Sequence, residues 1–140
     1  MIAIDTNVLL RYLLQDDDVQ AVKASKLLSG PDRVLVTDVV LVETLWTLRG
    51  KKYKLQKDEL VDVILALFME PMVRFENGQV VWKALNAYRE AKPIKGKEPD
   101  FADALIVCKA QYTVAAEDEV FGGSYTFDVA AQALEGAKKP

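Results

Sequence analysis

The fold class follows from the segment Ile2-Ala3-Ile4-Asp5-Thr6-Asn7-Val8-Leu9-Leu10, near the N-terminus of a 140-residue chain. A short apolar run ends at an acidic residue, and apolar residues then recur too densely for a surface strand. This pattern is typical of a strand, a turn and a buried helix. Thr6 or Asn7 is the expected N-cap of that helix. The segment therefore predicts the strand-to-helix unit of an α/β protein.

The same alternation of short apolar runs and helical periodicity continues along the chain. Further strands are expected at residues 34–36, 72–75 and 124–127, and helices at 19–28, 39–48, 55–68, 78–91 and from 100 to as far as 119. Because strands separated by helices need crossover connections, we expect a parallel sheet with helices on both faces. The length and composition favour a single domain over residues 1–140.

The composition limits the chemistry available to the chain. It contains no histidine, which excludes Ser-His-Asp and Cys-His catalysis and imidazole zinc sites. The single cysteine, Cys108, lies in an apolar helical run, so we expect core packing and a reducing compartment. An acid at Asp5 and the lack of a basic leader argue against a signal peptide, and no apolar run reaches the ~18 residues of a membrane span. These features predict a cytoplasmic protein.

Acidic residues stand in places where solvation does not explain them. Asp5 and Asp128 end apolar strands, and Glu43 and Asp103 interrupt apolar helical segments. Burying several carboxylates without a partner is costly, and the neighbouring segments offer no interleaved Lys or Arg. A divalent cation such as Mg²⁺ or Mn²⁺ solves the problem, because it prefers oxygen ligands. Asp100, three residues before Asp103, lies on the same helix face and can approach the same ion.

Structural explanations remain open for some of these acids. Asp5 and Asp100 could each serve only as a helix N-cap. Asp128 could be only a turn residue. Glu43 is the hardest to explain in this way, because neither capping nor solvation accounts for an acid midway along so apolar a helix.

Four motifs in order resemble the PIN-domain nucleases, and most of all the VapC-type toxins of prokaryotic toxin–antitoxin pairs. They are Ile4-Asp5-Thr6-Asn7-Val8-Leu9, Val40-Leu41-Val42-Glu43-Thr44-Leu45-Trp46, Asp100-Phe101-Ala102-Asp103-Ala104-Leu105-Ile106 and Thr126-Phe127-Asp128. The resemblance covers essentially the whole chain. It implies a three-layer α/β/α sandwich with a central parallel sheet.

The resemblance also implies a site and partners. The residues matching Asp5, Glu43, Asp103 and Asp128 form an acidic pocket for Mg²⁺ or Mn²⁺, joined by the one matching Asp100. Thr6 and Asn7 match a polar pair supporting the first acid, and Thr126 matches a hydroxyl beside the last. The implied activity is endoribonuclease cleavage of RNA by a homodimer that a small antitoxin protein neutralises.

Such a pocket supports phosphodiester hydrolysis without histidine, through a metal-activated water. Because the sequence pI is about 5.0, RNA must be recruited by the metal and a local basic patch. The candidates for that patch are Arg11, Arg49, Lys51 and Lys52.

Two other functions are compatible with the sequence. One is a catalytically silent module that binds a partner through an apolar groove containing Trp46, Leu48 and Tyr53, although core packing of these side chains is the simpler expectation. The other is a PIN nuclease of housekeeping RNA processing, or a structure-specific DNA nuclease.

Overall fold

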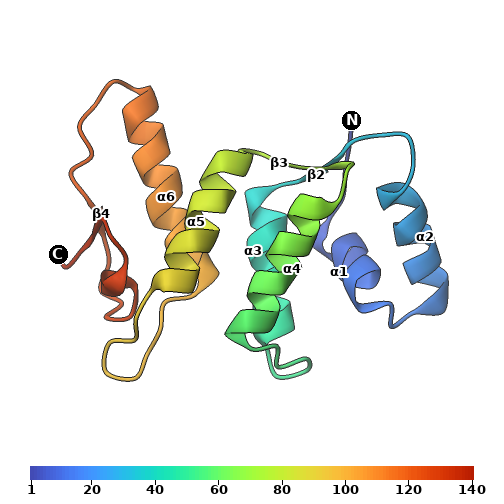
Figure 1. Cartoon of the computed structure of the whole chain (residues 1–140), viewed down its shortest axis with the longest axis horizontal. Helices are drawn as coiled ribbons and strands as arrows, with labels where there is room; N and C mark the ends of the chain where they lie inside the picture. Colours follow the sequence, from blue (N-terminus) through green and yellow to red (C-terminus); the bar gives the residue numbers. More distant parts are fainter. The chain divides into compact units, whose positions relative to one another are not determined.

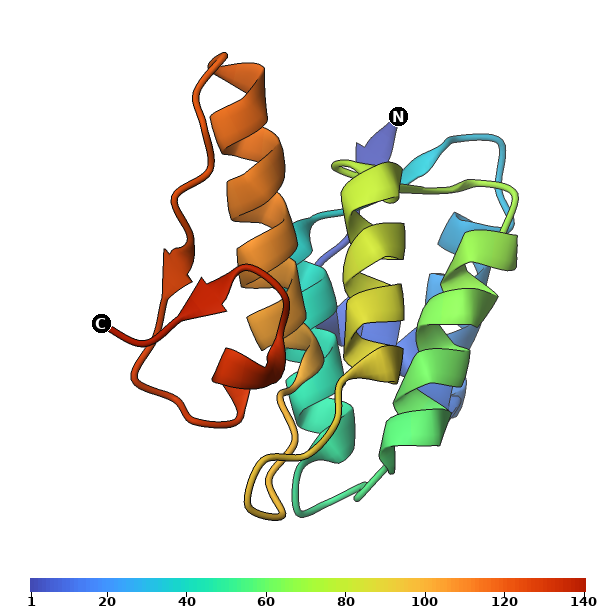
Figure 2. The same ribbon diagram turned by 60° about the vertical axis from the view of Figure 1, so that its left-hand side comes forward.

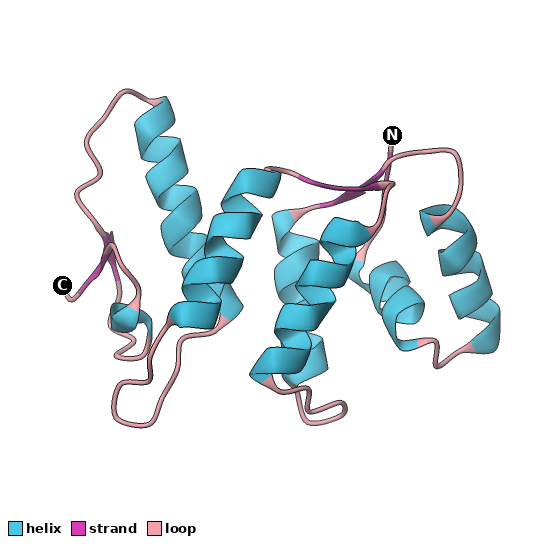
Figure 3. Ribbon diagram, viewed as in Figure 1, coloured by secondary structure: helices cyan, strands magenta, loops and turns pink.

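The computed structural model describes residues 1–140, which form two compact units, Met1–Glu76 and Asn77–Pro140. The first unit contains β1 (Ile2–Ala3), α1 (Thr6–Leu14), α2 (Asp18–Leu28), β2 (Val34–Val36), α3 (Asp38–Arg49), α4 (Lys57–Met69) and β3 (Val73–Phe75) (Figures 1 and 3). The second contains α5 (Gly78–Glu90), α6 (Phe101–Ala116), β4 (Ser124–Tyr125), the short 3-10 helix η1 (Ala131–Ala133) and β5 (Ala137–Lys138). A single functional domain over residues 1–140 stays a prediction.

The first unit is built on a three-stranded parallel sheet in the order β1-β2-β3. Ile2 pairs with Val34, which in turn pairs with Val73. Every connection between these strands passes through helices, as parallel pairing requires. The predicted α/β class and parallel sheet are confirmed.

Helices α1 to α4 supply most of the core of the first unit. Leu9, Leu41 and Ile64 have no exposed surface, and they come from three different helices. Helix α1 contacts α2 and α3, and α3 contacts α4. Helix α3 begins after Thr37, whose side chain accepts a hydrogen bond from the Val40 backbone N–H at 3.4 Å. This packing fixes the start of α1 and the middle of α3 with respect to each other.

The second unit consists of the α5–α6 pair and a small sheet. The rings of Tyr88 and Phe101 meet edge to face with centroids 6.1 Å apart, and Leu85 and Ala104 are fully buried. Figure 2 shows β4, η1 and β5 beside α6. Gly136 has φ of +93°, a conformation that glycine adopts at no steric cost.

The prediction that a strand at 124–127 joins the main sheet was wrong. Strand β4 has only two residues and pairs in parallel with β5 in a separate sheet. The Ser124 N–H donates to the Gly136 carbonyl at 2.8 Å, and the Thr126 N–H to the Lys138 carbonyl at 2.9 Å. Residues 137–138 form the strand that pairs with β4. Two residues are too few to show the apolar alternation from which a strand is predicted.

Helix boundaries differ from the predicted ones by a few residues. The N-cap of α1 is Asp5 rather than Thr6 or Asn7, because Thr6 is already helical. Helix α6 ends at Ala116, not at Glu119, since the chain turns at Glu117 and Asp118 adopts a positive φ of 58°. No helix has the length and apolar character needed to cross a bilayer.

Candidate active site

Asp5 stands where β1 turns into α1. Its side chain accepts a hydrogen bond from the Val8 backbone N–H at 3.0 Å, through the Oδ1 atom. The capping explanation is therefore correct for one of its oxygens. The carboxylate is exposed to solvent, so Oδ2 is accessible to a ligand.

Glu43 is joined to the start of α1 through Thr6. The Thr6 hydroxyl donates to Glu43 Oε1 at 3.2 Å, which links α1 to the middle of α3. Thr6 thus holds the second predicted acid close to the residue that follows the first. The structure brings Asp5, Thr6 and Glu43 together in the first unit.

The expectation that Glu43 is buried was wrong. Glu43 is exposed, on a stripe of α3 whose other members, Val39 and Trp46, are 66% and 54% exposed. Because apolar residues occupy this exposed stripe, the sequence of α3 looks apolar on all sides. The next residue, Thr44, is the one with no exposed surface, and its hydroxyl oxygen has no hydrogen-bond partner.

Asp100 and Asp103 cap the N-terminus of α6 reciprocally. The Asp103 N–H donates to Asp100 Oδ1 at 2.8 Å, and the Asp100 N–H donates to Asp103 Oδ2 at 3.0 Å. Each carboxylate therefore satisfies a backbone N–H of the other residue. The cap fixes both acids on one side of the helix start, as the spacing predicted.

Asp103 carries the clearest electrostatic perturbation among the acids. Its pKa is raised from 3.8 to about 6: burial is the largest cause, the hydrogen bond from the Asp100 backbone N–H opposes it, and the charges of Asp100 and Asp128 contribute to the rise. Carboxylates that lie close together disfavour one another's ionised form, whereas a nearby cation would favour it. Asp100, Asp103 and Asp128 thus form an electrostatically linked group in the second unit.

Asp128 lies in the turn after β4, three residues beyond its end. Its Oδ1 accepts hydrogen bonds from the Ala130 and Ala131 N–H groups at 2.9 and 3.3 Å. Its own N–H donates to the Thr126 hydroxyl at 3.0 Å. Asp128 is therefore a turn residue that hydrogen-bonds the backbone of the turn, as one explanation proposed. Thr126 supplies the hydroxyl beside the last acid that the family resemblance implied.

Burial does not explain the predicted acids as a set. Asp5, Glu43 and Asp128 are exposed, and only Asp100 and Asp103 are half-buried. The N-cap position explains the placement of Asp5, and the turn after β4 explains that of Asp128. Glu43, in the middle of α3, has neither explanation. Within neither unit do three acidic, histidine or cysteine side chains form a group that could hold one metal ion.

The chemistry of the donors fits Mg²⁺ or Mn²⁺. The candidate ligands are all carboxylate oxygens, which these hard cations prefer. Mg²⁺ keeps several waters and needs only one or two carboxylates, so a small group of acids is sufficient. The pKa of Asp103 is raised, first by burial, and a nearby cation would favour the ionised form of this carboxyl group.

Of the predicted basic residues, Arg11 is the one that shares a pocket with a predicted acid, Asp5. It lines a pocket of about 290 Å³ together with Asp5 and Asn7, between α1 and α2. Two polar residues of α2 that line the same pocket, Gln20 and Lys23, were not predicted from the sequence. Their three-residue spacing puts them on one helix face, but an exposed polar face is common to most surface helices.

The other predicted basic residues lie at the C-terminal end of α3. Arg49, Lys51 and Lys52 are all exposed, and the Lys52 ammonium lies 5.2 Å from the centre of the Tyr53 ring. The structure does not bring them to the pocket beside Asp5. Their role in binding RNA stays a prediction.

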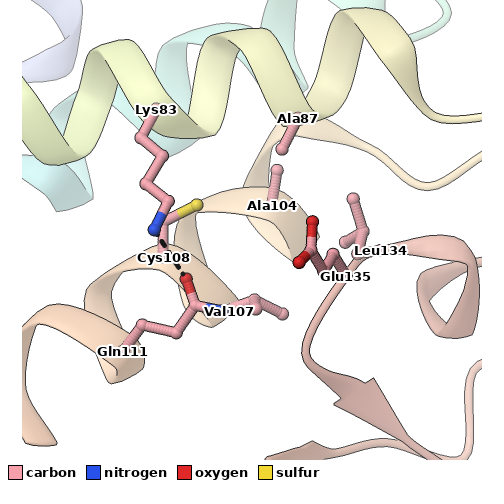
Figure 4. A pocket seen from close by; sticks show the side chains of 8 residues that line it. All are labelled: Lys83, Ala87, Ala104, Val107, Cys108, Gln111, Leu134 and Glu135. Atoms are coloured by element: carbon pink, nitrogen blue, oxygen red, sulfur yellow. Dashed lines mark hydrogen bonds between the residues drawn. The ribbon is translucent and has the colours of Figure 1, made fainter.

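A second pocket, of about 160 Å³, lies between α5 and α6 and contains none of the predicted acids (Figure 4). In it, the Lys83 ammonium donates to Gln111 Oε1 at 3.1 Å beside Cys108. Burial raises the pKa of the Cys108 thiol, against a smaller lowering by Lys83, so the thiol stays protonated at neutral pH. Cys108 is 5% exposed, which confirms its predicted core packing.

Comparison with known proteins identifies a family. The sequence model of the PIN domain matches residues 2–119, a range that includes every predicted acid except Asp128. No curated protein matches the chain significantly. Among solved structures, the chain is similar to Mycobacterium tuberculosis VapC20, a Sarcin-Ricin loop cleaving toxin. Its identity is 18%, with 95% of this chain and 94% of that chain covered and a TM-score of 0.41.

Proposed function

The chain belongs to the PIN domain family, a family of nucleases, and on this premise we propose that it is a metal-dependent endoribonuclease. The observation that carries the proposal is the group Asp100–Asp103–Asp128. Its mutual repulsion adds to burial in raising the pKa of Asp103 to about 6. Ionised carboxylates that repel one another destabilise the fold, and a bound divalent cation would offset this repulsion.

We assign the metal ligands to two groups of acids, Asp5 and Glu43 in the first unit and Asp100, Asp103 and Asp128 in the second, with no more than two carboxylates on any one ion. When bound, Mg²⁺ or Mn²⁺ supplies an activated water and offsets negative charge on the phosphoryl oxygens of RNA. Asp5 offers the oxygen that its helix cap leaves accessible.

Supporting residues hold these acids in place. The Thr6 hydroxyl orients Glu43 through the hydrogen bond to its Oε1. The Thr126 hydroxyl fixes the turn that carries Asp128. Asn7 lines the pocket beside Asp5, where its amide can contact the substrate. Orientation by neighbouring hydrogen bonds strengthens metal binding at such sites.

We further propose that the protein is the toxin of a VapBC-type pair, with a homodimeric, cytoplasmic form and a small antitoxin as partner. The four ordered motifs over essentially the whole chain support this assignment. Exposed apolar side chains beside Glu43, at Val39 and Trp46, provide surface that a partner can cover. Leu48, 1% exposed, belongs to the core and cannot contribute to such a surface.

The test of the enzymatic proposal is RNA cleavage by the purified protein with Mg²⁺, with Mn²⁺ and with EDTA. Asp5→Asn, which keeps an N-cap side chain, and Glu43→Gln should each lower the cleavage rate by at least about a hundredfold. Asp62→Asn, the same kind of change at an exposed position of α4, is the matched control and should cleave normally. Metal-independent cleavage, or full activity in Asp5→Asn, would exclude the proposed site.

A second measurement separates the toxin from a housekeeping nuclease or a silent module. Expression in a bacterial host should arrest growth for the wild type and not for Asp5→Asn, if the enzyme acts as a toxin. Cleavage of RNA in vitro without growth arrest would favour a processing nuclease. A folded protein that cleaves no RNA with either metal would favour the module.

A further inference from the structure

The pocket between α1 and α2 extends from Asp5 across polar and apolar side chains that the metal chemistry does not use. It is lined on α1 by Val8 and Arg11 and on α2 by Gln20, Lys23 and Leu27. Its volume of about 290 Å³ is near the lower limit of small-molecule sites, which start at about 300 Å³. The space is therefore suited to one small unit of a larger ligand.

The α2 side of the pocket is a regular helical stripe. Gln20, Lys23 and Leu27 follow one another at intervals of three and four residues, so they line one face of the helix. The stripe rises by about 10 Å along the axis. Helices α1 and α2 contact each other, and Figure 1 shows them as neighbours in the first unit. The pocket is therefore part of a fixed helix pair.

The charges in the pocket favour an anionic ligand. The Arg11 guanidinium is held by Asp16 at 2.9 Å, which orients it and offsets part of its charge. Lys23 has no acidic partner and is exposed, so its ammonium can contact a ligand from solvent. Because Asp16 offsets the charge of Arg11, the positive charge that can attract an anionic group at this pocket is that of Lys23.

The apolar side chains complete a surface for a nucleobase. Leu27 is 42% exposed although it lies in the pocket, and Val8 is half-buried beside it. A base can lie on such side chains while its phosphate meets Lys23 and Arg11. The amide of Gln20 can both donate and accept hydrogen bonds, as base edges require.

We propose that this pocket is a nucleotide subsite, which holds the RNA residue next to the scissile phosphate. The inference rests on the proposed function, because it places the bond to be cut beside Asp5. Arg11 lies six residues along α1 from Asp5, a rise of about 9 Å. Arg11 and Lys23 line the pocket beyond Asp5, along α1 and on α2, where the nucleotide that adjoins the scissile phosphate would lie. Lys23 is thus a substrate-positioning residue.

The test compares Lys23→Gln with Lys26→Gln, a neighbouring exposed lysine of α2 that does not line the pocket. Binding of a fluorescent single-stranded RNA oligonucleotide is measured by anisotropy in EDTA, where no cleavage occurs, over a range of salt concentrations. Cleavage of the same oligonucleotide is measured with Mn²⁺.

Lys23→Gln should weaken RNA binding about three- to tenfold and reduce the slope of log affinity against log salt by about 0.7. In cleavage it should raise KM and leave kcat near the wild-type value. Lys23→Arg should restore affinity, and Lys26→Gln should match the wild type.

Two outcomes would overturn the inference, and they can be told apart. If the wild type cleaves RNA and Lys23→Gln binds as tightly as Lys26→Gln, the subsite is wrong and the proposed function stands. A polypeptide segment would then be the better occupant of the pocket. If the folded wild type neither binds nor cleaves RNA, the proposed function fails and the subsite fails with it.

Discussion

Replacing Asp103 by asparagine should stabilise the protein while it removes the proposed metal ligand. Burial and the nearby charges of Asp100 and Asp128 raise the pKa of Asp103 from 3.8 to about 6. Because a tenfold change in proton affinity corresponds to about 1.4 kcal/mol, the ionised carboxylate disfavours the fold by at most about 3 kcal/mol. Solvent around this half-buried group reduces the penalty to about half of that.

Asparagine at position 103 keeps an oxygen that can accept from the Asp100 N–H. It gives up the favourable interaction of a negative charge with the N-terminus of α6, worth about 0.5 kcal/mol. The net gain for Asp103→Asn at pH 7.5 is therefore about 1 kcal/mol. For a chain of this size the gain corresponds to a rise in Tm of about 3–4 °C.

The dependence on pH has a definite sign. Because the pKa of Asp103 is higher in the folded protein, the folded state binds more protons between pH 4 and 6. Stability of the wild type is lowered as pH rises from about 4 to about 6, and the penalty is constant above that range. The advantage of Asp103→Asn should therefore be full at pH 7.5 and nearly absent at pH 4.

The assay is urea unfolding followed by circular dichroism, in EDTA, for the wild type, Asp103→Asn and the exposed control Asp62→Asn. Adding Mn²⁺ should stabilise the wild type and not Asp103→Asn, which reverses their order. If Asp103→Asn is no more stable than the wild type at pH 7.5 while Asp62→Asn is neutral, the carboxylate is not electrostatically strained. That result would refute the inference of a cation at Asp103.

Three further substitutions test other parts of the structure by urea unfolding. Thr44→Val should stabilise the protein by about 1 kcal/mol, because the buried Thr44 hydroxyl has no hydrogen-bond partner; a loss of more than about 1 kcal/mol would show that this hydroxyl is hydrogen-bonded in the folded protein. Tyr12→Phe should cost about 1 kcal/mol at pH 7, since the Tyr12 hydroxyl donates to Glu70 at 2.5 Å. That hydrogen bond raises the pKa of Tyr12 to about 12, so its stabilisation of the folded protein is full below pH 10 and is lost as pH rises through 12. If the stability difference between Tyr12→Phe and the wild type persisted beyond pH 12, this account of the hydrogen bond would be contradicted. Gly136→Ala should cost about 1–3 kcal/mol, because a Cβ there would lie 2.7 Å from Gln111 Nε2 at a φ of +93°; an unchanged midpoint would show that the turn can relax.

The sequence predicts the elements well because their signals are local. Strand β2 and the helices have apolar periodicity and capping residues that are read within a few positions. The assignment of Asp5 as a possible cap and the placement of Asp100 and Asp103 on one helix face depend on spacing alone, and the structure confirms both.

Burial and long-range pairing could not be predicted in the same way. Whether Glu43 is exposed depends on which stripe of α3 meets the other helices. The sequence does not indicate that stripe, because the apolar residues Val39 and Trp46 lie on the exposed side together with Glu43. Strand β5 has two residues and becomes a strand only through its partner β4. Lys23 reaches the pocket beside Asp5 through the packing of α2 on α1, which leaves no signal in the sequence of α2.

The most direct test of the proposed metal ligands is Mn²⁺ binding to one variant from each unit, Glu43→Gln and Asp103→Asn, against the wild type and Asp62→Asn. Isothermal titration gives the affinity and the number of ions, and RNA cleavage is measured on the same samples. If both groups of acids supply ligands, each site variant should lose at least tenfold in Mn²⁺ affinity together with its cleavage activity, while the control keeps both. Wild-type Mn²⁺ affinity in either Glu43→Gln or Asp103→Asn would contradict the assignment of ligands to both groups.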